Sequence, residues 1–276
     1  MGYGAQRWLA TLQRQSEYLG VTKLFVDPTV DSNVKRGIGM LAQRMTRNFC
    51  AGVCATTHKW KPIQLANGED AKLMTRENNS VYGEPVGVVL SATKTIWVPM
   101  KHQYLFEFFM NDEMRNQWDV LSNGGPMQHL VNIFKDQNIN NRISLYGDDI
   151  SANPNNILIL QDAFTDATGS LLVYATINSL VMNVLMKGED ASCVDLFSNG
   201  IAIVPDCFQN FSPANTCSDI SKKNDNEFCT GSLVTVGFQM LVNSFPGTND
   251  FVKSIKTAND LISHTIHKIK TAPRCK

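Results

Sequence analysis

The feature that most constrains the fold is a long amphipathic segment near the C-terminus. Between residues 248 and 270, apolar side chains recur at three- and four-residue steps, as on one side of a helix. This stripe consists of Phe251, Ile255, Ala258, Ile262, Ile266 and Ile269. Charged residues such as Lys256 and Asp260 lie off the stripe. A helix of this kind gains its stability by burying the stripe, so the preceding chain must provide an apolar surface for it.

That surface is predicted to be a sheet. Segments rich in Val, Ile, Thr and Trp predict strands at 70–77, 86–98, 127–135, 141–147, 156–165, 169–178, 193–205 and 231–243. A helix is predicted at 101–121, and residues 206–230 form a polar insertion. Short turns between successive strands favour antiparallel pairing. The sequence therefore predicts an α+β fold of the helix-grip type, in which a curved antiparallel sheet packs on the long C-terminal helix.

Helical segments precede this body. Residues 4–19 and about 35–56 carry apolar residues at helical spacing, and the second segment also carries several arginines. Residues 1–61 contain nine basic and three acidic side chains, although the whole chain has no net charge. The imbalance indicates either two parts of the chain or simply solvated helix faces.

Composition excludes several classes of protein. The balanced charge does not indicate a strongly basic nucleic-acid binder. No apolar run reaches the roughly 18–20 residues of a membrane span, and the first residues do not resemble a secretory signal. We therefore expect an intracellular protein whose seven cysteines are reduced thiols.

Several motifs carry a resemblance to a known family. They comprise residues 4–15 (GAQRWLATLQRQ), 41–53 (LAQRMTRNFCAGV), 118–128 (WDVLSNGGPMQ), 158–162 (LILQD), 169–175 (GSLLVYA) and 242–244 (VNS). In this order they resemble the START-containing C-terminal part of plant class IV homeodomain–leucine zipper (HD-Zip IV) transcription factors. The resemblance extends over nearly the whole chain.

The resemblance implies a domain organisation and a function. Residues 1–20 would be the terminal helix of a truncated START domain, 21–69 a linker with an amphipathic basic helix, and 70–272 a START-like helix-grip domain. The chain would be a fragment or short product that regulates transcription in the nucleus and binds a lipid or sterol, or a protein partner. DNA would be bound only through a homeodomain absent from these residues. The alternative is a free-standing lipid-binding or lipid-transfer protein, which would be cytoplasmic.

An apolar pocket between sheet and helix is the one functional site that we predict. Met and aromatic side chains suit an adaptable apolar cavity. The candidates are Trp97, Tyr174, Met182, Met186, Phe238, Met240 and Ile262. The alternative is that these side chains fill a solid core. We expect no cofactor and no enzymatic activity, because no catalytic motif is visible.

Polar and thiol clusters have structural interpretations. Arg115 is within helical reach of Asp112 and Asp119, which favours a structural ion pair beside a core Trp118. A zinc site at Cys50, Cys54 and His58 would lack a fourth ligand, so we predict no metal site. The three cysteines of the polar insertion, Cys207, Cys217 and Cys229, could pair if oxidised but are expected to be free thiols.

Overall fold

The structure is a computed structural model of the chain. It describes residues 32–55, 59–63, 71–79, 83–84, 86–120, 128–147, 157–166, 168–179, 181–182, 194–207, 229–242 and 248–271. The segment 4–19 and most of the polar insertion lie outside these residues. Among the helices in the described ranges, none combines the length and the apolar character needed to cross a membrane.

Three α-helices, one 3-10 helix and nine strands make up the described part of the chain. The helices are α2 (Ser32–Cys54), α3 (His102–Met110), the 3-10 helix η1 (Asp112–Gln117) and α5 (Asn249–Thr271). The strands are β1 (Lys61–Ile63), β2 (Lys72–Asn78), β3 (Gly87–Val98), β4 (Gln128–Phe134), β5 (Arg142–Gly147), β6 (Ile157–Asp166), β7 (Gly169–Asn178), β8 (Asn199–Cys207) and β9 (Cys229–Val242).

All nine strands belong to one sheet with the order β1-β2-β3-β9-β8-β7-β6-β5-β4. Every neighbouring pair is antiparallel. The chain crosses from one part of the sheet to the opposite edge only between β3 and β4, where it carries α3 and η1. The central pairing of β3 with β9 therefore unites the first three strands with the last six.

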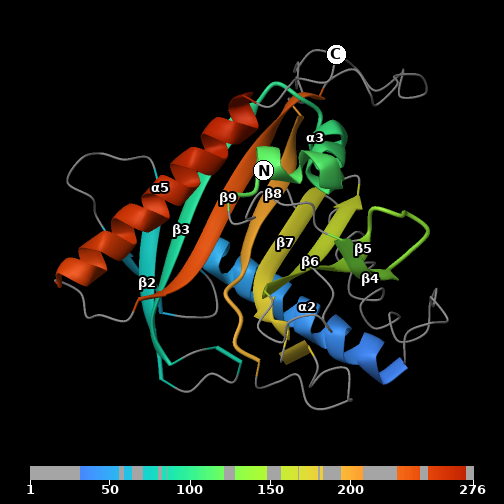
Figure 1. The fold of residues 1–276 in the computed structure, drawn as a ribbon. Coiled ribbons are helices and arrows are strands. Elements are labelled where there is room, and N and C mark those ends of the chain that lie inside the picture. The colour runs from blue at the N-terminus through green and yellow to red at the C-terminus, as the bar shows by residue number, and fades with distance from the viewer. Residues whose placement is uncertain are drawn as a thin grey trace, which may run out of the picture.

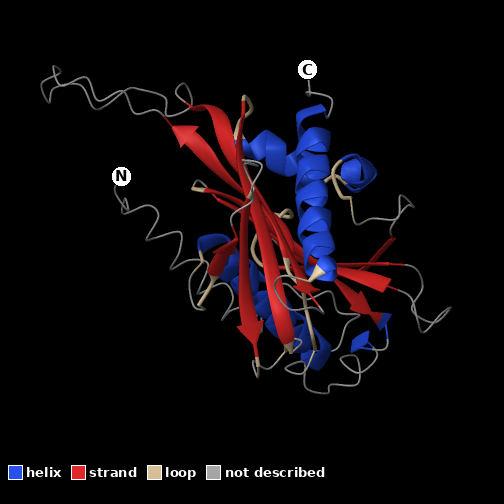
Figure 2. Cartoon of the chain, turned by 90° about the vertical axis from the view of Figure 1, so that its left-hand side faces the viewer, coloured by secondary structure: helices blue, strands red, loops and turns tan. Residues whose placement is uncertain are grey.

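Helices cover both faces of the sheet (Figures 1 and 2). On the front face, α5 lies across β3 and β9, and α3 lies over β7 and β8. On the back face, α2 crosses β6, β7, β9 and β3. Two apolar clusters result, one under α5 and α3 and one under α2. Strands of this kind are apolar on both faces and show little alternation.

Two glycines let α2 approach the back of the sheet closely. A Cβ atom at Gly237 would lie 2.9 Å from Cε2 of Phe49, and one at Gly200 would lie 3.1 Å from the same atom. The Phe49 ring therefore packs directly on the backbone of β8 and β9. Only glycine leaves room for an aromatic ring at these two places.

The predicted fold class, an α+β helix-grip with an antiparallel sheet on a long C-terminal helix, is confirmed. The predicted helix 101–121 was too long, because the chain breaks at Asn111 and continues as η1. The Asn111 side chain accepts a hydrogen bond from the backbone N–H of Glu113 (3.0 Å) and so starts the new turn. Strand β1 was not predicted. It pairs with β2, and α2 packs on the back of the sheet, although both elements lie in the segment 21–69 that was predicted to be a linker.

Substituting Ile262 by Ala tests whether the buried stripe of α5 stabilises the fold. Ile262 is fully buried in the front cluster. We expect the variant to lose about 2–5 kcal/mol of unfolding free energy, as large-to-small core changes do. Urea denaturation followed by circular dichroism measures the loss.

Val252→Ala is the matched control, because Val252 lies on the same helix and is 59% exposed. It should change stability by less than about 0.5 kcal/mol. Equal effects of the two substitutions would mean that α5 does not grip the sheet through this stripe.

Candidate functional site

A buried arginine lies where η1 meets the sheet. Arg115 is only 5% exposed, and the turn of η1 directs it inward together with Trp118, which is completely buried. Backbone N–H groups of Trp118 and Asp119 donate to the Arg115 carbonyl oxygen (3.1 and 2.9 Å), which closes the turn. The sequence Arg-Asn-Gln-Trp-Asp thus places a cation, an indole and a carboxylate side by side in the interior.

Two of the three guanidinium nitrogens have protein partners. Nε of Arg115 donates to Oδ2 of Asp119 (3.0 Å), and Nη1 donates to Oε1 of Gln161 (2.6 Å). Gln161 in turn donates from Nε2 to the Tyr146 hydroxyl (3.3 Å). The predicted ion pair therefore exists with Asp119, and the separate hydrogen bond from Arg115 to Gln161 ties η1 to β6. Asp112, the other carboxylate considered, pairs with His129 instead.

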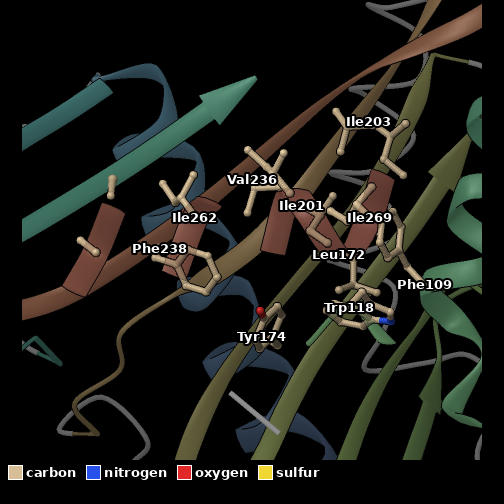
Figure 3. Close-up of a cluster of buried hydrophobic side chains, with 14 of the residues drawn as sticks. Phe109, Trp118, Leu172, Tyr174, Ile201, Ile203, Val236, Phe238, Ile262 and Ile269 are labelled. Carbon is tan, nitrogen blue, oxygen red and sulfur yellow. The ribbon is translucent and has the colours of Figure 1, made fainter. Parts of the chain in front are cut away.

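Aromatic rings surround the guanidinium group. The Cζ atom of Arg115 lies 5.0 Å from the ring centroid of Tyr146, 5.2 Å from that of Trp118 and 5.6 Å from that of Tyr174. These are cation–π distances, which stabilise a buried cation. Trp118 and Tyr174 also contact each other edge to face at 5.8 Å, and Phe109 contacts Trp118 at 5.4 Å (Figure 3).

Two N–H donors of this cluster have no acceptor. Nη2 of Arg115 and Nε1 of Trp118 are buried and have no hydrogen-bond partner among the described residues. The hydroxyl of Thr265, on the buried side of α5, also has no hydrogen-bond partner among the described residues. Leaving a buried polar group without a partner costs roughly 1–3 kcal/mol, more for a charged group. An atom that accepts hydrogen bonds would therefore be stabilised next to these donors.

The two tyrosines of the cluster remain neutral phenols at physiological pH. Burial raises the pKa of Tyr174 well above its usual value of 10.0, and the negative charge of Asp119 raises it further, while Arg115 opposes the shift. Burial also raises the pKa of Tyr146, with Asp112 acting in the same direction.

Four of the predicted pocket residues lie in the front cluster. Tyr174, Phe238 and Ile262 are buried there, and Met240 packs partly buried against them. Figure 3 shows Tyr174, Phe238 and Ile262 facing one another between the sheet and α5. These residues line the space between sheet and helix in which the pocket was predicted.

The other three predicted residues do not join them. Trp97 is 49% exposed and pairs across strands with Leu233 on the face away from α5. Met182 is buried in the back cluster under α2. Met186 lies outside the described residues. The pocket remains a prediction, and only the four residues of the front cluster are carried further.

Arg115, Gln161 and Tyr146 were not predicted as site residues. Their spacing of 46 and 15 residues along the chain gives no local pattern. The one available indication was the Arg-x-x-Trp-Asp sequence, which was interpreted only as a structural ion pair.

No metal centre is present in the described part of the chain, where no three His, Cys, Asp or Glu side chains could hold an ion together. Cys50 and Cys54 lie exposed on α2. His58, the third residue considered for zinc, is outside the described residues.

Comparison with known proteins gives a consistent result. Residues 31–275 match the family described as "PDF2-like, C-terminal domain". The whole chain is 38% identical to homeobox-leucine zipper protein HDG1 and 40% identical to ANTHOCYANINLESS 2, both of Arabidopsis thaliana. It is 41% identical to homeobox-leucine zipper protein ROC4 of Oryza sativa subsp. japonica. The chain spans about a third of the length of each of these relatives (35%, 34% and 34%).

Among solved structures, human STARD10 aligns with a TM-score of 0.40 and 9% identity. The alignment covers 83% of this chain and 79% of that one. A likeness of this size carries no argument about function.

Removing the cation should destabilise the protein more than removing the whole ion pair. Arg115→Met leaves the buried Asp119 carboxylate without its cation and should cost about 3–5 kcal/mol. The double variant Arg115→Met/Asp119→Asn should be less destabilised than the single variant, because no buried charge is left unpaired. Urea denaturation of the four proteins of this cycle measures the coupling.

The exposed pair Lys253–Asp250 (3.1 Å, side chains 78% and 75% exposed) provides the control. Lys253→Met should cost less than about 1 kcal/mol, as surface pairs do. Additive effects of Arg115→Met and Asp119→Asn would contradict the described coupling.

Tyrosine ionisation should destabilise the protein at alkaline pH. Because the pKa of folded Tyr174 lies above 10.0, the unfolded chain releases this proton first as pH rises. Stability from this group is complete below pH 10 and decreases above it. Tyr174→Phe should therefore show a shallower decrease of unfolding free energy above pH 10 than the parent protein, measured by urea denaturation across that range. Identical slopes would show that the Tyr174 phenol ionises freely in the folded state.

Proposed function

Because the chain belongs to the PDF2-like C-terminal domain family, we propose that it is a regulatory region of a homeobox-leucine zipper transcription factor that acts in the nucleus. The named relatives are homeobox-leucine zipper proteins that match over the full chain. DNA would be bound by the homeodomain of such a factor, and dimers would form through its zipper. In this proposal, residues 1–20 end a START domain, 21–69 lead out of it, and 70–272 form the helix-grip body. This region binds rather than catalyses.

The proposed activity of the body is to bind an apolar ligand between the sheet and α5. Nη2 of Arg115, which is buried beside the apolar front cluster and has no partner among the described residues, carries this proposal. Trp118 supplies a second unpaired donor on the same turn of chain. Tyr174, Phe238, Ile262 and Met240 provide apolar surface on the side toward α5. Small-ligand sites typically combine such apolar walls with a few fixed polar groups.

The chemistry of the donors limits the class of ligand. Arg115 and Trp118 offer only N–H groups, so the ligand must present an acceptor oxygen. Asp119 already balances the charge of Arg115, which favours an uncharged oxygen over an anion. A sterol hydroxyl or an acyl carbonyl at the end of an apolar body meets both conditions. Such a molecule would regulate the factor by stabilising the folded C-terminal region.

Lipid binding by the purified chain tests the proposal. Lipids extracted from the protein are identified by mass spectrometry, and the fluorescent sterol dehydroergosterol and a fluorescent phosphatidylcholine in vesicles are then titrated separately. We expect one of these two probes to bind. Trp118→Phe should weaken its binding about 2- to 10-fold, because this change removes one hydrogen bond of about 0.5–1.5 kcal/mol and keeps an aromatic ring.

Trp97→Phe is the matched control, because its exposed indole already donates to Asp206 (2.8 Å) on the opposite face. It should leave binding unchanged. A protein that carries no lipid and binds neither probe contradicts the ligand proposal. If the chain binds a probe but Trp118→Phe leaves reporter transcription by the full-length factor unchanged, the result favours a lipid-binding module without a regulatory role.

A further inference from the structure

The hairpin of β8 and β9 brings two cysteines into register. Cys207, the last residue of β8, is paired with Cys229, the first residue of β9. The preceding pair is Asp206 with Gly231, and a shift of register between the two pairs leaves Thr230 as an extra residue on β9. Twenty-one residues separate the cysteines in the sequence, yet the ladder places them opposite each other.

Opposed positions of an antiparallel ladder suit a disulfide. Directly opposed residues share a face of the sheet, with Cα atoms about 4.5 or 5.5 Å apart in the two kinds of pair. Disulfides join residues whose Cα atoms are about 4.4–6.8 Å apart. The register that opposes Cys207 to Cys229 is therefore compatible with the backbone spacing of a disulfide.

Described side chains next to the cysteines hold this register. Nε1 of Trp97 on β3 donates to Oδ2 of Asp206 on β8 (2.8 Å). The Trp97 ring packs on Gly231, where a Cβ atom would lie 2.6 Å from the ring. The hydroxyl of Ser232 donates to the carbonyl oxygen of Met100 (2.7 Å). These contacts join β3, β9 and β8 within three residues of the cysteine pair.

We propose that Cys207 and Cys229 form a disulfide under oxidising conditions and that this bond is a redox-sensitive modification site. A disulfide such as oxidised glutathione is the oxidant. The thiolate of one cysteine attacks a glutathione sulfur and displaces one glutathione thiolate, and the second cysteine thiolate then attacks the mixed disulfide and displaces the other. Two protein thiols are oxidised and one oxidised glutathione is reduced to two thiols.

The bond would close residues 207–229 into a covalent ring at the base of the polar insertion. Closure of a loop restricts the unfolded chain, so the oxidised protein should be more stable than the reduced one. Under reducing conditions the two thiols are free, as expected for an intracellular protein. The site is separate from the Arg115 cluster and does not depend on the proposed ligand.

Peptide mapping of the folded full chain tests the proposal. The protein is equilibrated in a glutathione redox buffer, free thiols are alkylated, and the protein is digested with trypsin without reduction. A disulfide would link fragments 188–222 and 224–253, which contain Cys207 and Cys229 respectively. The first fragment also contains Cys193 and Cys217, so serine variants identify the partner.

The expected result is that Cys217→Ser and Cys193→Ser keep the linked fragments, whereas Cys207→Ser and Cys229→Ser reduce them at least about tenfold. The parent protein unfolded in urea is the reference for unselective pairing. Thermal melting of the oxidised and reduced parent should show a higher midpoint for the oxidised form. Absence of the linked fragments, or their loss in Cys217→Ser with retention in Cys207→Ser, overturns the proposal.

Discussion

The pairing of β3 with β9 is the interaction on which the rest of the structure depends. It runs from Val88 opposite Val242 to Val98 opposite Ser232, and joins segments about 140 residues apart in sequence. Without it, β1–β3 would form a separate small sheet and α5 would have no continuous surface to cover. Because α5 follows β9 in the chain and lies on both β3 and β9, the β3–β9 pairing and the docking of α5 stabilise each other. Pairing over so long a separation is entropically costly before its contacts form, so we expect it to limit the folding rate.

Strand β6 shows that the two faces of the sheet differ in their buried polar groups. Its neighbouring residues Gln161 and Asp162 point to opposite faces, and each receives a buried cation. On the back face, the ammonium group of Lys135 pairs with Asp162 and donates to the carbonyl oxygen of Ala163 (3.1 Å), while Thr46 of α2 donates to Asp162 (2.7 Å). On the front face, Arg115 binds Gln161 but keeps one nitrogen without a partner among the described residues.

Local sequence patterns predicted most elements but not their long-range contacts. Most predicted strands and the final helix are found within about two residues of their expected limits, because hydrophobic spacing and turns are local properties; β8 is the exception and begins six residues after the expected position 193. The break at Asn111 was missed because a capping side chain competed with a favourable helical pattern.

Trp118 was correctly predicted to be a core residue. Trp97 could not be placed, because the face to which a strand residue points depends on register, and the sequence alone does not define register. The partners of Arg115 come from other strands, so only the folded chain brings them together.

The contrast between Lys135 and Arg115 supports the proposal that the front cluster binds a ligand. An arginine kept only for stability would be expected to have all its donors satisfied, since a buried ion pair seldom stabilises more than apolar residues of similar size. Lys135 approaches that condition, with both a carboxylate and a carbonyl as acceptors. Arg115 instead is held on two sides by Asp119 and Gln161 and lies close to three aromatic rings, which fix the direction of its Nη2 amino group. A donor that is fixed and desolvated, with no partner among the described residues, would bind an acceptor oxygen without the cost of reorganisation, and this supports Arg115 as the polar anchor of the proposed apolar ligand.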